Sequence, residues 1–297
     1  MLEIGKLTGQ STATISRLIS QARDLGIVTI TVTPADSDMD GLSTRLSEAL
    51  DTAAHVVPGT AGDPVRTSRL CGAEAATVVA KQLPYAGTVA WSAGHTIAAL
   101  VTSLRAQQRT ALHSVPAIGG YDPVQPHLDT NALVRLAAAR LGGPSHLLLA
   151  PATTESAEAR RILLEDPTIL STTTRWNDID AFVFSSSAPA DAVPTGFSVM
   201  ANARGRDRSE LIEAGFVGDA LGHLFTLEGS FHDDKWSEQL IAMSLEQMKQ
   251  VRTRIAVVAG IEKTLSVIGL ARTRIPTLIV TDEPTARSVL SKIEGGA

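Results

Sequence analysis

The sequence predicts an α/β protein in which a short helical module precedes a domain built on a mostly parallel sheet. From about residue 41 onward, short apolar runs alternate with amphipathic helical patterns, with glycine or proline at the joins. The first 33 residues differ, because two short helical patterns and one alternating segment follow one another almost without spacers. We therefore expect an N-terminal module at residues 1–33, a linker at 34–40 and a large domain at 41–297.

The composition excludes several classes of protein. Hydrophobic residues make up 44% and charged residues 19% of the 297 residues, as in globular proteins. No apolar run is long enough to span a bilayer and no secretory signal opens the chain, which predicts a cytoplasmic protein. Cys71 is the single cysteine and the histidines lack metal-ligand spacing, so neither a metal nor a cofactor is expected. A net charge of -5 argues against a protein that coats nucleic acid, but it permits a small DNA-reading module.

The N-terminal module has the order of a helix-turn-helix followed by the start of a wing. A first helix over residues 2–8 is expected to end at Gly9, and Ser11 offers a hydroxyl N-cap for a second helix. Apolar residues recur at helical spacing along one face of that second helix: Ile15, Leu18, Ile19, Ala22 and Leu25. After Gly26, apolar residues alternate with threonines through residues 28–32, which predicts a half-buried strand.

The start and the free face of the second helix carry groups that suit DNA. Short polar side chains near its start can donate to phosphates or base edges, and Arg17 can bridge phosphate oxygens or read a guanine. The candidate DNA-binding residues are Gln10, Ser11, Thr12, Thr14 and Arg17. The alternative interpretation is a helical hairpin with only a structural role and a solvated Arg17.

The large domain is predicted to alternate strands and helices. The strands are expected at Ala54–Val57, Thr88–Trp91, Ser114–Ile118, His146–Ala150, Ala181–Phe184, Ile255–Ala259 and Thr277–Val280. The clearest helices are expected at Ser68–Leu83, Thr96–Arg105, Asn131–Leu141, Ser209–Ala214, Ser244–Val251 and Pro284–Ile293. In open α/β sheets ligands bind beyond the carboxyl ends of the strands, so the loops after these strands are the candidate sites.

Two of these loops have the composition of a ligand cradle. Residues 91–96 follow a strand and open a helix, so the amides and side chains of Ser92, Gly94, His95 and Thr96 can surround an anion. The pair Gly119 and Gly120 follows the next strand and allows a ligand to approach the backbone closely. For both loops the alternative is an ordinary turn.

Charged side chains follow later strands of the predicted sheet. Lys263 comes after the strand that ends at Ala259 and can pair with a phosphate. Asp282 follows the last strand, where it either accepts hydrogen bonds from sugar hydroxyls or caps the next helix. Asp219 adds a carboxylate in a glycine-rich turn, and a carboxylate with a lysine is also what proton transfer on a sugar requires, so an enzyme remains an alternative.

The chain resembles the SorC family of sugar-sensing bacterial transcriptional regulators, sometimes grouped with the DeoR type. In the N-terminal module the resemblance covers residues 8–28, with Ser16-Arg17-Leu18, Ala22-Arg23 and Gly26-Ile27-Val28. In the large domain the matching motifs follow the family's order: Gly94-His95-Thr96, Ile118-Gly119-Gly120, Asn131, Leu149-Ala150-Pro151, Gly215 to Asp219, Val258-Ala259-Gly260 with Lys263, and Thr281-Asp282-Glu283 with Thr285-Ala286.

The resemblance implies a Rossmann-like effector-binding domain related in fold to phosphosugar isomerases. It implies a sugar or sugar-phosphate effector, operator DNA as a partner, and assembly into homotetramers or homodimers. Carried over by position, Ser92, Gly94, His95 and Thr96 hold phosphate or sugar oxygens with Lys263 opposite, and Asp219 contacts hydroxyls. No residue is assigned a catalytic role.

The sequence departs from the family pattern at three places. Ile261 stands where the family usually has a second glycine, and Ser185-Ser186 replaces a glycine-containing turn, so the rim of the pocket differs. The family has a further helix before residues 2–7, so we expect the first helix of the DNA-binding module to be missing. Two alternatives follow: a phosphosugar isomerase-like enzyme in which Asp219 and Lys263 move protons, and an effector-binding protein with impaired DNA binding.

Overall fold

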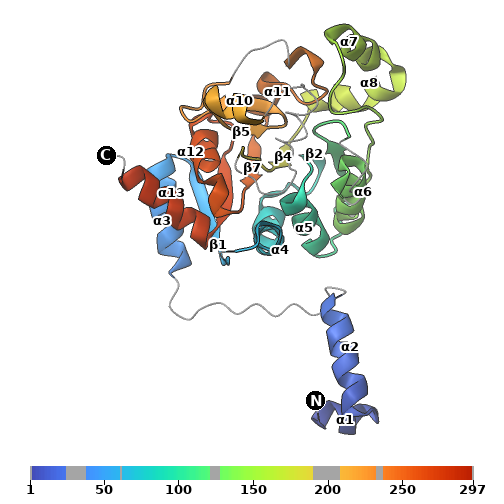
Figure 1. The fold of residues 1–297 in the computed structure, drawn as a ribbon. Helices are drawn as coiled ribbons and strands as arrows, with labels where there is room; N and C mark the ends of the chain where they lie inside the picture. The colour runs from blue at the N-terminus through green and yellow to red at the C-terminus, as the bar shows by residue number, and fades with distance from the viewer. Residues whose placement is uncertain are drawn as a thin grey trace. The chain divides into compact units, whose positions relative to one another are not determined.

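The computed structural model of the protein describes residues 2–24, 38–60, 62–120, 128–189, 208–231 and 237–295. The chain forms two compact units, Met1–Ser37 and Asp38–Ala297 (Figure 1). The strand expected at residues 28–32 and most of the expected linker lie outside the described residues. The last residues assigned to that linker belong to a helix instead, because the Asp38 side chain accepts a hydrogen bond from Gly41 N at 2.8 Å and caps α3 (Met39–Leu50).

The small unit contains the two predicted helices, α1 (Leu2–Thr8) and α2 (Thr12–Asp24). Gly9 separates them with a φ of 67°, in the left-handed region where glycine is favoured. Thr14 N donates to Ser11 Oγ at 3.1 Å, which confirms Ser11 as the N-cap of α2. Ile15 is buried, as expected for the apolar face of this helix.

The large unit is built on a six-stranded parallel sheet in the order β1-β8-β7-β4-β2-β3. The strands are β1 (Ala53–Val57), β2 (Gly87–Trp91), β3 (Leu112–Pro116), β4 (Ala181–Phe184), β7 (Thr253–Val257) and β8 (Leu278–Asp282). These strands confirm six of the seven predictions, with bounds that differ by at most two residues.

Helices cover both faces of this sheet (Figure 1). One apolar cluster packs the sheet against α4 (Pro64–Gln82), α5 (His95–Ser103) and α6 (Thr130–Leu141). The other cluster involves α3, α8 (Pro167–Thr173), α11 (Leu245–Gln250), α12 (Thr264–Arg272) and α13 (Glu283–Glu294). The remaining described elements are α7 (Ala157–Glu165), α10 (Arg208–Glu213) and the 3-10 turns η2 (Thr174–Asn177), η3 (Ser237–Gln239) and η4 (Ile261–Lys263).

The strand order reverses direction at β2. After β2 the chain adds β3 on one side, and it then returns to add β4 on the other side. The connections that leave the carboxyl ends of β2 and β4 therefore diverge, and such a divergence leaves a crevice at the end of the sheet. The loop from Ser92 to Gly94 and the turn from Ser185 to Ser187 begin at this point.

A two-stranded antiparallel hairpin, β5 (Phe216–Ala220) and β6 (His223–Thr226), stands apart from the main sheet. It packs closely on α12, because a Cβ at Gly218 would lie 2.5 Å from Ser266 Oγ and a Cβ at Gly269 would lie 2.8 Å from Thr226 O. Neither this hairpin nor the helices α3, α7, α8 and α12 were predicted from the sequence. The hairpin brings Asp219 to the crevice end of the sheet.

The prediction of a strand at His146–Ala150 is wrong. The segment makes only isolated bridges, at Ser145 and Pro151. The side chain of Asn131 replaces a neighbouring strand, because its Oδ1 accepts from Leu148 N at 2.9 Å and its Nδ2 donates to Leu148 O at 3.0 Å. Leu149 is 66% exposed, so the apolar run that suggested a buried strand does not mark the core.

The predicted helices of the large unit are all present. Five of them match their predicted bounds within two residues, and α4 begins four residues earlier, at Pro64 rather than Ser68. The early start follows from Asp63, which accepts a hydrogen bond from Arg66 N at 2.7 Å and caps the helix. No helix in the described ranges combines the length and apolar character needed to cross a bilayer.

The packing of α4 on α5 predicts that Gly72→Ala destabilises the large unit. A Cβ at this position would lie 2.3 Å from Thr96 O, so α5 would have to move, at a cost of about 1–3 kcal/mol. The free energy of unfolding can be measured in urea by the fluorescence of Trp91 and Trp176. Thr77→Ala, an exposed change on the same helix, is the control. Equal midpoints of urea unfolding for the two variants would show that the close packing of Gly72 on α5 does not contribute to stability.

Candidate functional site

Ser92 joins the two strands at the point where the strand order reverses. It follows β2, and its backbone N donates to Val183 O on β4 at 3.0 Å. Its Oγ accepts a hydrogen bond from Ser185 N, in the turn after β4, at 3.2 Å. Ser92 is 5% exposed, so these bonds lie inside the protein and tie the loop after β2 to the turn after β4.

The loop after Ser92 presents backbone to open space. Gly94 has a φ of 110°, which L side chains rarely adopt, and no atom lies within 4 Å of the position where a Cβ would stand. Gly94 is the N-cap residue of α5, and no side chain in the described ranges caps that helix. His95 and Thr96 form its first turn, with His95 half-buried and Thr96 buried. The segment predicted as an anion cradle is therefore the start of α5, with open space beside Gly94.

Lys263 reaches the same end of the sheet from η4. The side chain is only 7% exposed, and its Nζ donates to Ser186 O at 3.1 Å. Ser186 Oγ donates to Asp219 O at 2.8 Å and lies 2.8 Å from Ser266 Oγ on α12. A buried ammonium needs such oxygen partners, because burial of a charge without them is costly.

Asp219 lies on the other side of the same turn. Its Oδ1 accepts hydrogen bonds from Ser187 Oγ and from Ser187 N, and its Oδ2 accepts from Gly222 N at 2.8 Å. Lys263 therefore contacts Ser186, and Asp219 contacts the next residue, Ser187. A buried cation and a buried carboxylate thus lie on the two sides of one turn. Ser92, Asp219 and Lys263, predicted separately from the sequence, come together around the turn from Ser185 to Ser187.

Ser187 and Ser266 were not predicted from the sequence. Ser185 and Ser186 were expected only as a departure from the family pattern. The signal that could have found Ser187 is the run of three serines directly after a fully buried strand. Ser266 carries no local signal, because its position opposite Ser186 depends on the packing of α12.

The other predicted ligand residues have contacts of a structural kind. Asp282 is 0% exposed and caps α13, with Oδ1 accepting from Thr285 N at 3.1 Å and Oδ2 from Thr285 Oγ1 at 2.7 Å. Its Oδ2 also accepts from Gly260 N at 2.9 Å, so it holds the loop that leads to Lys263. Of the two roles left open by the sequence, these contacts are those of a cap.

Gly119 and Gly120 are held by backbone packing. Gly119 N donates to Ile241 O and Gly120 N donates to Ala150 O, both at 2.9 Å. A Cβ at Gly119 would lie 2.2 Å from Pro151 O, so only glycine permits this approach of two backbone segments. Their amides therefore support the loop rather than point to a free ligand position.

The chemistry of the site is that of polar recognition. Burial raises the pKa of the Cys71 thiol well above its usual range and the Asp282 carboxylate adds to the rise, so Cys71 is an uncharged packing residue. No group of three His, Cys, Asp or Glu side chains within the described ranges has the geometry of a metal site. The hydroxyls, the ammonium and the carboxylate around the serine turn are suited to bind the oxygens of a polyhydroxylated or phosphorylated molecule.

The candidate DNA-binding residues lie at the start of α2 and along its first turns. Gln10, Ser11, Thr12 and Arg17 are exposed, while Thr14 is half-buried. Ser11 Oγ and Thr14 Oγ1 are 2.9 Å apart, so both hydroxyls take part in capping the helix. Arg17 makes no ion pair with any described residue and stands one turn beyond Thr14.

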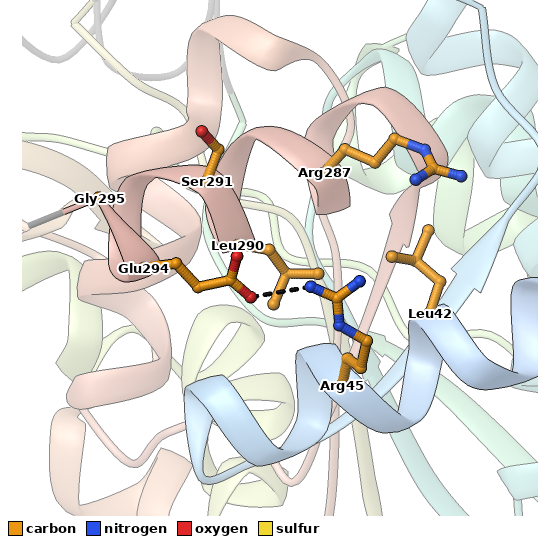
Figure 2. A pocket seen from close by; sticks show the side chains of 7 residues that line it. All are labelled: Leu42, Arg45, Arg287, Leu290, Ser291, Glu294 and Gly295. Atoms are coloured by element: carbon orange, nitrogen blue, oxygen red, sulfur yellow. Dashed lines mark hydrogen bonds and ion pairs between the residues drawn. The ribbon is translucent and has the colours of Figure 1, made fainter.

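A separate groove lies between α3 and α13 (Figure 2). Its volume is about 470 Å³, and an ion pair between Arg45 and Glu294, 2.8 Å long, crosses it. Leu42 and Leu290 form its apolar floor. None of the residues predicted from the sequence lines this groove, so it is not part of the crevice.

Comparison with known proteins gives a consistent group of relatives. The family described as "Putative sugar-binding domain" matches residues 36–291. The sorbitol operon regulator of Klebsiella pneumoniae is 26% identical over 293 residues, which cover 97% of this chain and 92% of that protein. The erythritol catabolism regulatory protein EryD of Brucella abortus is 22% identical over 300 residues, covering 98% of this chain and 92% of that protein.

Solved structures show the same similarity. The crystal structure of the full-length sorbitol operon regulator SorC from Klebsiella pneumoniae superposes with a TM-score of 0.79 at 25% identity, over 97% of this chain and 93% of that chain. The DeoR family transcriptional regulator from Listeria monocytogenes has the same fold, with a TM-score of 0.75 at 22% identity over 85% of this chain and 100% of that chain.

The contacts of Asp282 predict a large loss of stability in Asp282→Ala. The change removes the buried acceptor of Thr285 N at the start of α13 and one of the two acceptors of Gly260 N, which should lower the free energy of unfolding by about 2–4 kcal/mol. Asp129→Ala is the matched control, because Asp129 caps α6 through a single bond to Ala132 N. Urea unfolding of both variants checks this, and equal losses would show that the bond to Gly260 adds nothing.

Proposed function

The chain belongs to the sugar-binding domain family of SorC-type transcriptional regulators, and we propose that it is a DNA-binding regulator whose large unit senses a carbohydrate or a sugar phosphate. It controls genes of carbohydrate metabolism and acts in the cytoplasm, where operator DNA is present. The observation that carries the proposal is the grouping of Ser92, Asp219 and Lys263 around one serine turn at the reversal of the strand order.

Each residue around the crevice has a role in effector binding that fits its contacts. Lys263 pairs with a phosphate or a sugar oxygen, and Asp219 accepts hydrogen bonds from hydroxyls. The start of α5 supplies backbone donors at Gly94, His95 and Thr96, with Ser92 below them. Gly119, Gly120 and Asp282 act indirectly, because they shape the neighbouring loops.

The small unit supplies the DNA contacts. In a helix-turn-helix the second helix enters the major groove with its N-terminal residues against the bases, and here that helix is α2. Gln10, Ser11, Thr12 and Thr14 then contact phosphates and base edges, and Arg17 contacts a phosphate or a guanine. Two such helices are needed for a two-fold symmetric operator, so the protein acts as a homodimer or a homotetramer.

Effector binding changes operator affinity by a shift between assembly states. A ligand shifts such an equilibrium only by the difference between its affinities for the two states. An effector in the crevice therefore changes operator affinity only if the position of the serine turn or of the Lys263 loop differs between the two assembly states. No chemical turnover is required.

A phosphosugar isomerase-like enzyme is the second candidate. It is favoured by the position of Asp219 and Lys263 on the two sides of one turn, since proton transfer needs an acid and a base near the same substrate. Incubation of the protein with sugar phosphates, followed by product analysis, distinguishes the two. Turnover that disappears in Asp219→Asn would replace the sensor with an enzyme.

Effector binding is expected to depend on Lys263. A panel of sugars, sugar alcohols and their phosphates is screened by thermal unfolding, and a saturating effector should raise the Tm by about 5 °C. Lys263→Ala should lose most of this rise, because the phosphate or sugar oxygens lose their cation. Lys292→Ala, an exposed change on α13, should keep it. A rise that survives intact in Lys263→Ala would refute the role of this residue.

DNA binding is expected to depend on Arg17. Duplexes enriched from a random library at fixed salt provide the operator probe, since phosphate contacts make the affinity depend on salt. Arg17→Ala should weaken binding to this probe by about 10- to 100-fold while effector-induced stabilisation stays unchanged. Arg66→Ala, an exposed change in the large unit, is the control. Unchanged affinity in Arg17→Ala would contradict the assignment of α2 as the reading helix.

A further inference from the structure

Two histidines form a close pair at the edge of the main sheet. His113 Nδ1 and His146 Nε2 are 2.8 Å apart, and the two ring planes lie at 12° to each other with their centroids 5.1 Å apart. His113 lies on β3, the last strand of the sheet. His146 lies on the segment that begins as an extension of the sheet, with His146 N donating to Ser114 O at 2.9 Å.

The segment that carries Arg175 lies beside the same pair, because Thr172 Oγ1 donates to Leu147 O and Trp176 Nε1 donates to Pro116 O, both at 2.7 Å. Side chains alternate along β3, where Leu112 belongs to the apolar cluster of α4, α5 and α6, and Val115 belongs to the cluster on the opposite face. His113 therefore points to the face of Val115, which is also covered by Trp176, the residue after Arg175. The guanidinium of Arg175 acts electrostatically on His146.

His113, His146 and Arg175 form a cluster in which the positive charge of Arg175 has no described carboxylate as an ion-pair partner. Arg175 Nε is buried and makes no hydrogen bond, a condition that is unfavourable for a guanidinium. Within the described ranges, no ion pair joins a carboxylate to Arg175, His113 or His146. The cluster therefore lacks an anionic partner among the side chains described.

The charged groups around the cluster come from few elements. Before β4, Asp178 is exposed and Asp180 already accepts a hydrogen bond from Thr88 N at 2.8 Å. The neighbouring helix α8 has no charged residue, and Arg135 and Arg140 belong to α6, which packs on the opposite face of the sheet. Helix α11 also contacts η2, through the bond from Gln247 Nε2 to Asn177 Oδ1 at 2.8 Å, and carries Glu246 and Lys249. None of these described neighbours forms an ion pair with Arg175 or with the two histidines.

The histidine pair changes its hydrogen-bonding character with one proton. When both rings are neutral, they share one N–H in the bond between them and carry one more N–H on an outward nitrogen. One added proton turns the remaining outward nitrogen into a donor, so that both outward nitrogens and Arg175 present N–H groups. Burial, then Arg175 and then His113 lower the pKa of His146, and an anion that neutralises Arg175 would raise it again.

We propose that His113, His146 and Arg175 form a second anion-binding site, separate from the crevice, which takes a tetrahedral oxyanion such as sulfate or phosphate together with a proton. The site depends on these three side chains and not on the proposed binding of a sugar. Because linkage is reciprocal, an anion that draws a proton onto the pair binds more tightly as the pH falls, and the added affinity is lost as the pH rises through the imidazole range.

Calorimetric titration with inorganic sulfate tests the proposal. Sulfate keeps its charge across the pH range used, so any pH dependence comes from the protein. The titration uses the full chain with Lys263→Ala, which removes the cation of the crevice. The dissociation constant should be about tenfold lower at about pH 6 than at about pH 8. Titrations in buffers of different ionisation enthalpy should show net proton uptake on binding.

Three variants locate the binding. His146→Gln should abolish the proton uptake, and Arg175→Gln should weaken sulfate binding at both pH values. Arg135→Gln removes an exposed arginine from the opposite face and should change neither. Sulfate binding without proton uptake, or equal binding in His146→Gln and Arg135→Gln, would overturn the proposal. The titration of the chain with intact His113, His146 and Arg175 decides the question even if Arg175→Gln fails to fold.

Discussion

The hydrogen bonds of Ser92 are the interaction on which the site depends. A parallel sheet that reverses its strand order opens a crevice because two connections leave neighbouring strands in opposite directions. The neighbouring loops would separate without a tie, and Ser92 provides it through Val183 O and Ser185 N. The position of the serine turn, and therefore of Lys263 and Asp219, follows from this tie. A small side chain with both donor and acceptor groups suits a buried position between two backbones.

The serine turn also solves an electrostatic problem. Lys263 and Asp219 are both nearly buried, and a charge inside a protein is tolerated when oxygens or N–H groups surround it. Here the backbone carbonyl of Ser186 contacts the ammonium, while Ser187 and Gly222 N donate to the carboxylate. A site organised in this way before the ligand arrives loses little free energy on binding, since few side chains have to be ordered. This property is what a sensor of small polar molecules needs.

The failed strand at His146–Ala150 and the second anion site have a common origin. The segment from Ser145 to Pro151 joins the edge strand β3 only by the bridge at Ser145, and beyond it Asn131 takes the bonds of Leu148. As a result His146 lies beside His113 at the sheet edge, next to η2. The apolar run that suggested a strand contained no sign of this arrangement, since it depends on one amide side chain of the preceding helix, α6. Local pattern fails where a single side chain replaces a backbone ladder.

The sequence by itself determined the class of fold, the six strands of the main sheet, the N-cap of α2 at Ser11 and the family. Periodicity, capping residues and ordered motifs are local properties of the chain, so they can be recognised without the tertiary structure. The sequence also supplied Ser92, Asp219 and Lys263 as separate candidates. Only the tertiary structure decided that these three residues meet around one turn and that Ser187 and Ser266 complete the polar network. It also decided that Asp282 caps α13 and accepts a hydrogen bond from Gly260 N. The reason is that the strand order and the packing of the β5–β6 hairpin on α12 bring together residues far apart in the chain, and no local pattern encodes such contacts.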